Sequence, residues 1–146
     1  MPAAAAPDAI AQTLIRHDLR PTPTRRAVPQ AFSGKPYALT GAEIERDLGP
    51  DTDCITLYRT LLAFEQQGLL HRVADDTDAV RYAACSIECS PGAHFDNHAH
   101  FKCEVCQLTY CLTQVAIPAV VLLGRFTVQR REYLLWGTCG QCQGSK

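Results

Sequence analysis

Two identical short motifs constrain the fold of this chain most: Cys103-x-x-Cys106 and Cys139-x-x-Cys142. They are separated by about thirty residues, a spacing that lets each pair form a knuckle and lets the two knuckles close one tetrahedral site. Four thiolates complete the coordination of Zn²⁺ and leave no open position for chemistry. We therefore expect a structural Zn²⁺, whose binding free energy is folding free energy for a small C-terminal domain.

The cysteine count points to the same use. The chain has 8 cysteines in 146 residues, and in a reducing compartment metal ligation is a more common role for cysteine than disulfide bonding. Residues 1–7 form an alanine-rich tail without the basic start and apolar stretch of a secretion signal. No apolar run approaches the roughly 18 to 20 residues that cross a bilayer. We expect a cytoplasmic protein without membrane contact. The alternative to metal ligation by the paired cysteines is that they form disulfides or a redox Cys-x-x-Cys pair.

The first third of the chain predicts three helices. Apolar residues recur at helical spacing between Asp8 and His17, and the proline-containing segment 19–23 interrupts the pattern. A second helical stretch begins at Thr24, although a proline inside it argues against an unbroken helix. Thr40 and Glu43 fit a capping box, which predicts that a third, short helix starts there.

A longer helix and a hairpin complete this domain. Asp53 can cap a helix over residues 54–67, which a glycine closes. Two strand-like runs, 69–73 and 79–83, then flank an acidic turn. Helices, a helix-turn-helix and a terminal hairpin in this order describe a winged helix, which we place at residues 8–84, with the helix from Cys54 in the position that reads DNA.

Helical spacing divides the residues of this fourth helix into two faces. The face expected to be buried consists of Cys54, Leu57, Leu61 and Phe64, and the face expected to be exposed consists of Thr56, Arg59, Thr60, Ala63 and Gln67. The formal net charge of the chain is only −1, so a DNA-binding surface must be a local patch. Four arginines between Arg16 and Arg26 form one candidate patch.

The remainder of the chain predicts a hinge followed by a small β-rich domain. Residues 85–100 combine cysteines and histidines and form the expected hinge and metal-sensing segment, and residues 101–146 form the second domain. Short apolar runs at 107–112, 125–129 and 132–136 predict strands. The fold class is therefore α+β, with an N-terminal winged helix-turn-helix domain and a small β-rich α/β domain.

Four stretches of the sequence resemble the ferric uptake regulator family of bacterial metal-responsive repressors. They are Leu19–Arg25, Thr56–Leu61 with the following Glu65–Leu69, His98–Cys106 and Gly137–Cys142. The resemblance covers nearly the whole chain. It implies a homodimer built on the C-terminal domain, with metal binding at the hinge setting the angle between two DNA-binding domains. Tyr37-Ala38-Leu39 stands where iron and peroxide sensors of the family have a ligand histidine.

The resemblance also assigns DNA contacts. It favours Tyr58 and Arg59 as residues that face DNA, with Thr56 beside them, because the planar fork of arginine suits base edges and phosphates. Arg20 and Arg25 are expected to contact the phosphate backbone, which gives affinity without sequence information. A two-fold symmetric dimer requires a roughly palindromic operator.

A second, exchangeable zinc ion is expected at the hinge. His98 and His100 alternate along an extended segment, so both imidazoles can point to one site. The candidates for the remaining ligands are His71, Cys85, Cys89, His94 and Cys111. The similarity to zinc uptake regulators implies the set His71, Cys85, His98 and His100. Thiolate with imidazole favours Zn²⁺ over Fe²⁺ or Mn²⁺.

The alternative functions are a thiol or peroxide sensor that uses Cys85, Cys89 or Cys111, and an iron or manganese sensor of the same family. No basic residue adjoins Cys85 or Cys89 to lower a thiol pKa. A zinc-ribbon interaction module would not explain the order of helices, and no open zinc site for an enzyme or a small-molecule substrate is indicated. The sequence leaves open the operator, the metal sensed, and whether metal strengthens or relieves DNA binding.

Overall fold

The computed structural model describes residues 7–73, 75–84, 99–112, 115, 117–129 and 131–144. The chain divides into two units, residues 1–95 and residues 96–146. Among the described helices, none is both long and apolar enough to cross a membrane.

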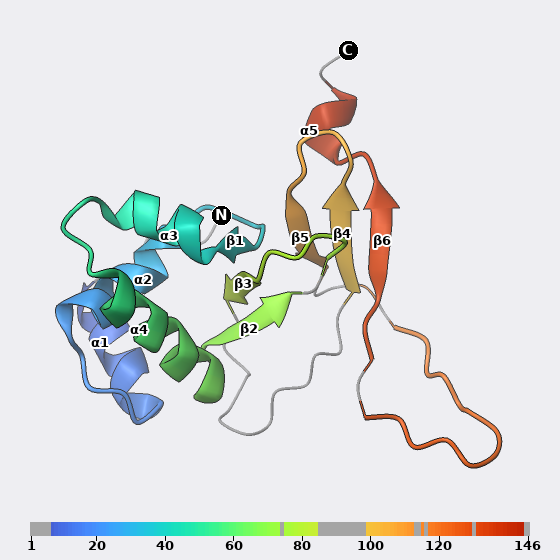
Figure 1. Cartoon of the computed structure of the whole chain (residues 1–146), viewed down its shortest axis with the longest axis horizontal. Helices are drawn as coiled ribbons and strands as arrows, with labels where there is room; N and C mark the ends of the chain where they lie inside the picture. Colours follow the sequence, from blue (N-terminus) through green and yellow to red (C-terminus); the bar gives the residue numbers. More distant parts are fainter. Residues whose placement is uncertain are drawn as a thin grey trace. The chain divides into compact units, whose positions relative to one another are not determined.

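The first unit contains four helices and a small sheet (Figure 1). Its elements are α1 (Pro7–Arg16), α2 (Pro23–Ala31), β1 (Leu39–Thr40), α3 (Gly41–Leu48), α4 (Cys54–Gln66), β2 (Leu70–Val73) and β3 (Arg81–Ala84). The helix starts follow from side-chain caps, because Thr22, Thr40 and Asp53 each accept a hydrogen bond from a backbone N–H of the first turn. The capping box of Thr40 and Glu43 is confirmed, and α2 continues through Pro29.

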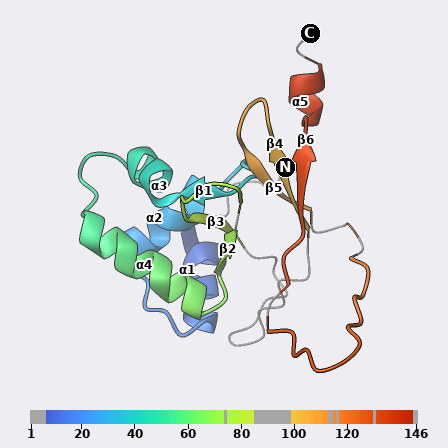
Figure 2. The same cartoon turned by 45° about the vertical axis from the view of Figure 1, so that its right-hand side comes forward.

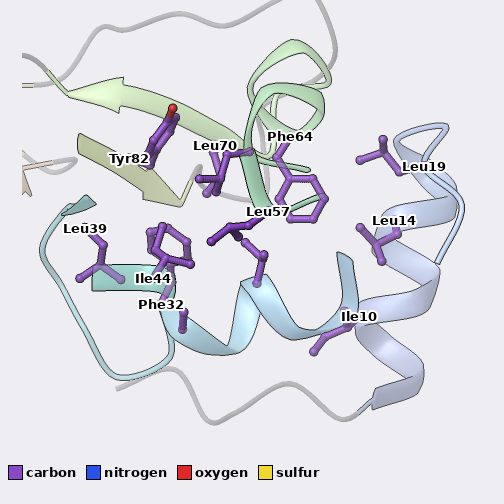
Figure 3. Close-up of a cluster of buried hydrophobic side chains, with 13 residues drawn as sticks. Ile10, Leu14, Leu19, Phe32, Leu39, Ile44, Leu57, Phe64, Leu70 and Tyr82 are labelled. Carbon is purple, nitrogen blue, oxygen red and sulfur yellow. The ribbon is translucent and has the colours of Figure 1, made fainter. Parts of the chain in front are cut away.

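The helices of this unit enclose one hydrophobic core. Leu14 of α1, Ile44 of α3 and Phe64 of α4 are almost completely buried, with exposed fractions of 1%, 0% and 1%. Figure 3 shows Phe64 and Leu57 pointing from α4 into the space between the helices and the sheet. Burying a side chain of this size contributes about 1.5–3 kcal/mol. The core therefore fixes α4 firmly against the other helices of the unit.

The hairpin after α4 forms the predicted wing. Strands β2 and β3 are antiparallel, with Leu70 opposite Ala84, and β1 pairs with the other edge of β3, with Leu39 opposite Tyr82. The sheet order is thus β1-β3-β2. Three helices, the long helix α4 and this sheet confirm the winged helix-turn-helix fold.

Two residues of α4 were assigned to the wrong face. Cys54 is exposed, because it stands at the first position of the helix, before α4 reaches the core. Thr60 is buried with an exposed fraction of 4%, and its hydroxyl donates to the backbone oxygen of Thr56 at 2.8 Å. That bond satisfies the hydroxyl and lets a threonine line the core. Ala63 and Gln67 are half-buried rather than exposed.

The second unit contains a three-stranded sheet with the order β5-β4-β6 and a short terminal helix. Its elements are β4 (Ala99–Cys103), β5 (Thr109–Leu112), β6 (Leu134–Gly137) and α5 (Gly140–Gln143). Strand β5 is antiparallel to β4, whereas β6 is parallel to it. Figures 1 and 2 both show α5 following directly at the end of β6.

The strands predicted at 107–112 and 132–136 correspond to β5 and β6, but the strand predicted at 125–129 is wrong. Residues 125–129 have no regular secondary structure, and Phe126 in this segment is 74% exposed. A short apolar run forms a strand when neighbouring strands and a packed face support it. Within the described residues, this segment pairs with no strand.

Candidate metal centre and DNA-contacting helix

The four predicted cysteines come together at one end of the second sheet. The sulfur atoms of Cys103, Cys106, Cys139 and Cys142 all lie within 4.8 Å of one another. Cys103 is the last residue of β4 and is buried, Cys139 caps α5, and Cys142 lies inside that helix. None of the four is in a disulfide. The cluster can hold a metal ion, and four sulfur ligands in this spacing suit tetrahedral Zn²⁺.

A glycine at the end of β6 allows the two halves of the cluster to meet. Gly137 pairs with Cys103 in the parallel register of β4 and β6. A Cβ atom at position 137 would lie 3.2 Å from the ring of Phe101, so a larger residue would require that ring to move. The backbone N–H of Glu104 donates to the Gly137 oxygen at 2.8 Å. This close approach brings Cys139, two residues later, to the end of β4.

The first knuckle is held by a tight turn and a buried lysine. Gln107 has a positive φ of 63°, and its N–H donates to the Cys103 oxygen at 3.0 Å. The Lys102 side chain is 1% exposed, and its ammonium donates to the Gln107 carbonyl at 2.9 Å. A buried ammonium is costly unless polar or charged groups surround it. The bond to the Gln107 carbonyl satisfies the Lys102 ammonium and fixes the turn that follows Cys106.

Hydrogen bonds distribute protons unevenly among the sulfurs. Backbone N–H groups, first that of Cys106 and then that of Cys139, lower the pKa of Cys103 to about 6. The Cys139 N–H lies 3.4 Å from the Cys103 sulfur. A hydrogen bond with Cys139 raises the pKa of Cys142 to about 12. Without a cation the cluster therefore keeps part of its protons, and a divalent ion would displace them.

Tyr110 is an additional side chain in contact with the cluster. It lies on β5, opposite Phe101 of β4, and its hydroxyl forms a hydrogen bond with the Cys139 sulfur. Burial, together with this bond, raises the pKa of Tyr110, so the hydroxyl is the donor. A donor of this kind stabilises the thiolate form of a ligand and fixes its orientation.

The predicted sensing residues are divided between the two units. His100 of β4 lies opposite Cys111 of β5, and their ligand atoms are within 4.8 Å of each other. Both therefore offer ligands on one part of the second sheet. His71 is buried on β2 of the first unit. The remaining candidates, which are Cys85, Cys89, His94 and His98, lie outside the described residues.

Helix α4 presents Tyr58 and Arg59 to solvent, as predicted. Tyr58 is 57% exposed and Arg59 is also exposed. Leu57, the residue before Tyr58, points to the other side of the helix and is buried. Thr56 is also exposed, but its hydroxyl donates to the Asp53 carboxylate at 2.6 Å. In the α1–α2 connection, the Arg25 guanidinium donates to the Arg20 backbone oxygen at 3.1 Å. This bond ties the loop residue Arg20 to Arg25 in the first turn of α2.

Three residues near these sites were not identified from the sequence. Lys102 and Tyr110 give no spacing signal, because their roles depend on the pairing of β4 with β5 and on the turn at Gln107. Ile55 did carry a signal, since it stands off the buried stripe of α4 and is therefore expected on the outside. It is 63% exposed.

A winged helix followed by a β-rich unit with a four-cysteine cluster defines a class of metal-binding, DNA-regulating proteins. The profile of the Ferric uptake regulator family matches residues 16–119. The chain belongs to this family of metal-responsive transcription regulators, which are not enzymes.

Solved structures have the same fold at low sequence identity. A zinc uptake regulator complexed with zinc and DNA has a TM-score of 0.63 at 20% identity, over 97% of this chain and 97% of that one. The ferric uptake regulator of Vibrio cholerae has a TM-score of 0.60 at 16% identity, over 88% and 98%. That of Pseudomonas aeruginosa with manganese has 0.57 at 17%, over 90% and 98%. A search of curated protein sequences gives no match.

Replacing Cys139 with serine should remove the metal ion from the cluster and unfold most of the second unit, because three remaining thiolates leave an open, weakened site. Mass spectrometry measures the metal content. Circular dichroism measures the loss of structure, and analytical ultracentrifugation measures the accompanying loss of the dimer. Cys54→Ser is the matched control, since Cys54 is exposed and outside the cluster. A Cys139→Ser protein that keeps its metal and its fold would contradict the assignment.

Replacing Tyr110 with phenylalanine should weaken zinc retention about tenfold, at the lower end of the effect of removing a hydrogen-bond partner from a metal ligand. The fold should survive, because only a hydroxyl is removed. Competition with a chromophoric chelator measures the affinity. Tyr133→Phe is the control, since its hydroxyl donates to the Pro118 oxygen at 3.2 Å and not to a cysteine. Equal affinities in the two variants would exclude the proposed role of Tyr110.

Proposed function

We propose that this chain is a zinc-responsive transcriptional repressor that acts in the cytoplasm as a homodimer on a palindromic operator. The observation that carries the proposal is the exposed Tyr58–Arg59 pair on α4, the second helix of the helix-turn-helix in a winged-helix unit. In this fold the second helix enters the major groove. The structural relative complexed with zinc and DNA supports the same use for this chain.

The DNA contacts are proposed to come from two parts of the first unit. Arg59 contacts base edges or phosphate, and Tyr58 contacts a thymine methyl group or a phosphate. Arg20 and Arg25 contact the phosphate backbone, so binding should decrease as salt increases. Thr56 contributes mainly through Asp53, because its hydroxyl hydrogen is already engaged.

Exposed apolar side chains of the second unit support homodimerisation. Among the described residues, the large ones are Val105, Val115, Val120, Val121, Leu122, Leu123, Phe126, Val128, Leu135 and Trp136. Leu123 is 88% exposed and Val121 is 82% exposed. So many exposed apolar residues in one small unit are typical of a surface that another subunit covers. We propose that this subunit is a second copy of the same chain, which would also place two DNA-binding units on one operator.

Two zinc ions with different roles are proposed for each chain. The cluster of Cys103, Cys106, Cys139 and Cys142 would hold a structural ion, and its four sulfurs exclude further chemistry there. A second, exchangeable ion would be bound by His98 and His100. Its further ligands would come from His71, Cys85, Cys89, His94 and Cys111. The pairing of His100 with Cys111 supports a mixed nitrogen and sulfur set, which favours zinc over iron or manganese.

Replacing Arg59 with alanine should cost about 1–3 kcal/mol in operator binding and leave the dimer intact. The loss arises because the guanidinium contributes two donors to a base edge or phosphate. Fluorescence anisotropy with an operator duplex measures it. Arg131→Ala is the matched control, since Arg131 is an exposed arginine of the second unit outside the apolar segment from Val120 to Val128. If the affinity of the Arg59 variant is unchanged, α4 is not the surface that reads DNA.

Replacing both His98 and His100 with alanine should abolish zinc-dependent operator binding while dimerisation and the four-cysteine site remain. A ligand shifts a conformational equilibrium only through its different affinities for the two states, so losing the ligands removes the response. Anisotropy titrations in buffered zinc measure this, with Cys85→Ser, Cys89→Ser and Cys111→Ser in parallel. A full zinc response in the double variant would refute the sensor, and stronger responses to Mn²⁺ or Fe²⁺ in the unaltered protein would favour the alternative metals.

A further inference from the structure

The exposed surface of α4 contains an isoleucine that the core does not use. Ile55 is 63% exposed, more than Tyr58 at 57%. It is the second residue of the helix and precedes Tyr58 by three positions and Arg59 by four. Residues at these spacings lie on the same face of a helix. Ile55 therefore extends the Tyr58–Arg59 surface to the N-terminal end of α4.

The position of Ile55 matters for recognition. A recognition helix contacts base edges mainly with its N-terminal residues. Ile55 stands in the first turn of α4, whereas the buried residues Leu57, Leu61 and Phe64 attach the helix to its unit. An exposed β-branched residue in a first turn contributes nothing to that attachment. It does add an apolar group at the end of the helix that comes nearest to the bases.

The polar groups next to Ile55 are engaged by the protein itself. The Asp53 carboxylate accepts the Thr56 N–H at 2.9 Å and the Thr56 hydroxyl at 2.6 Å. The Cys54 thiol donates to the Glu45 carboxylate at 3.7 Å. The Cys54 thiol and both donors of Thr56 are thus directed towards carboxylates of the protein. Ile55 remains as the side chain that points outward with no polar atom.

We propose that Ile55 is a specificity-determining residue that recognises the C5-methyl group of one thymine in each operator half-site. This inference rests on the proposed DNA-binding function and deepens it. The thymine methyl is the apolar feature that a base edge presents in the major groove, and apolar side chains contact it. Cytosine, adenine and guanine present no methyl group at that edge for Ile55 to contact.

Removing one thymine methyl group should lower the affinity for the operator only slightly. Removing both symmetry-related methyl groups should double the loss in binding free energy. Burying one methyl group changes affinity about fourfold, and a two-fold symmetric operator contains two such contacts, so both together give about fifteenfold. This loss should appear when the thymine is replaced by deoxyuridine, which pairs identically and lacks only the methyl group. Ile55→Ala should lose the same preference, because its shorter side chain does not reach the methyl.

The experiment starts by selecting an operator from a library of random duplexes with the full-length, zinc-loaded protein. Each thymine of the selected duplex is then replaced symmetrically by deoxyuridine, and affinities are measured for the unaltered protein and for Ile55→Ala. We expect one position at which the unaltered protein prefers thymine about fifteenfold and the variant shows no preference. Ile15→Ala is the matched control, because Ile15 is a similarly exposed isoleucine, at 61%, on α1.

Each outcome has a distinct meaning. If no thymine discriminates in the unaltered protein, or if Ile55→Ala keeps the full preference, the proposal for Ile55 is overturned while operator binding stands. If no duplex is selected at all, DNA binding itself fails, and Ile55 fails with it. Thermal melting by circular dichroism checks that the variant is folded, as expected for an exposed residue replaced by a better helix former.

Discussion

The clustering of four thiols at one end of a three-stranded sheet is the constraint on which the second unit depends. The buried hydrophobic cluster of the described residues belongs entirely to the first unit. Among the described residues of the second unit, the buried side chains are Ala99, His100, Lys102, Cys103 and Thr109, which are mostly small or polar. Such a set cannot offset the conformational entropy of an ordered sheet by apolar burial alone. A metal ion bound by the cysteines and a second subunit are the two sources of free energy that fit.

The two units therefore offset the conformational entropy of folding by different means. In the first unit, α4 is held by Leu57, Leu61 and Phe64, so its outward face is free to vary for recognition. In the second unit, the strand ends carry the four clustered cysteines, and hydrogen bonds around them, including those of Lys102 and Tyr110, hold the turn and the sulfurs in place. The proposed DNA contacts on α4 and the four-cysteine cluster thus use different residues.

The sequence predicted best those features that depend on a few neighbouring residues. Thr40 with Glu43, Asp53 before α4, and the paired cysteines each have a local physical signature, and the structure contains them all. Features that depend on distant partners were harder to predict. The buried Thr60 needs the backbone oxygen of Thr56 and a place in the core, and the run at 125–129 lacks a neighbouring strand. The role of Tyr110 follows only from the pairing of β4 with β5.

The parallel pairing of β4 with β6 has a consequence for how the second unit finds its native arrangement. Parallel strands end at the same edge of a sheet, which places Cys103 and Cys139 together, whereas antiparallel pairing would separate the ends by about 13 Å for four residues. A slip of one residue would also turn every side chain to the opposite face. A metal ion bound by all four cysteines would therefore favour one strand direction and one register over the alternatives during folding.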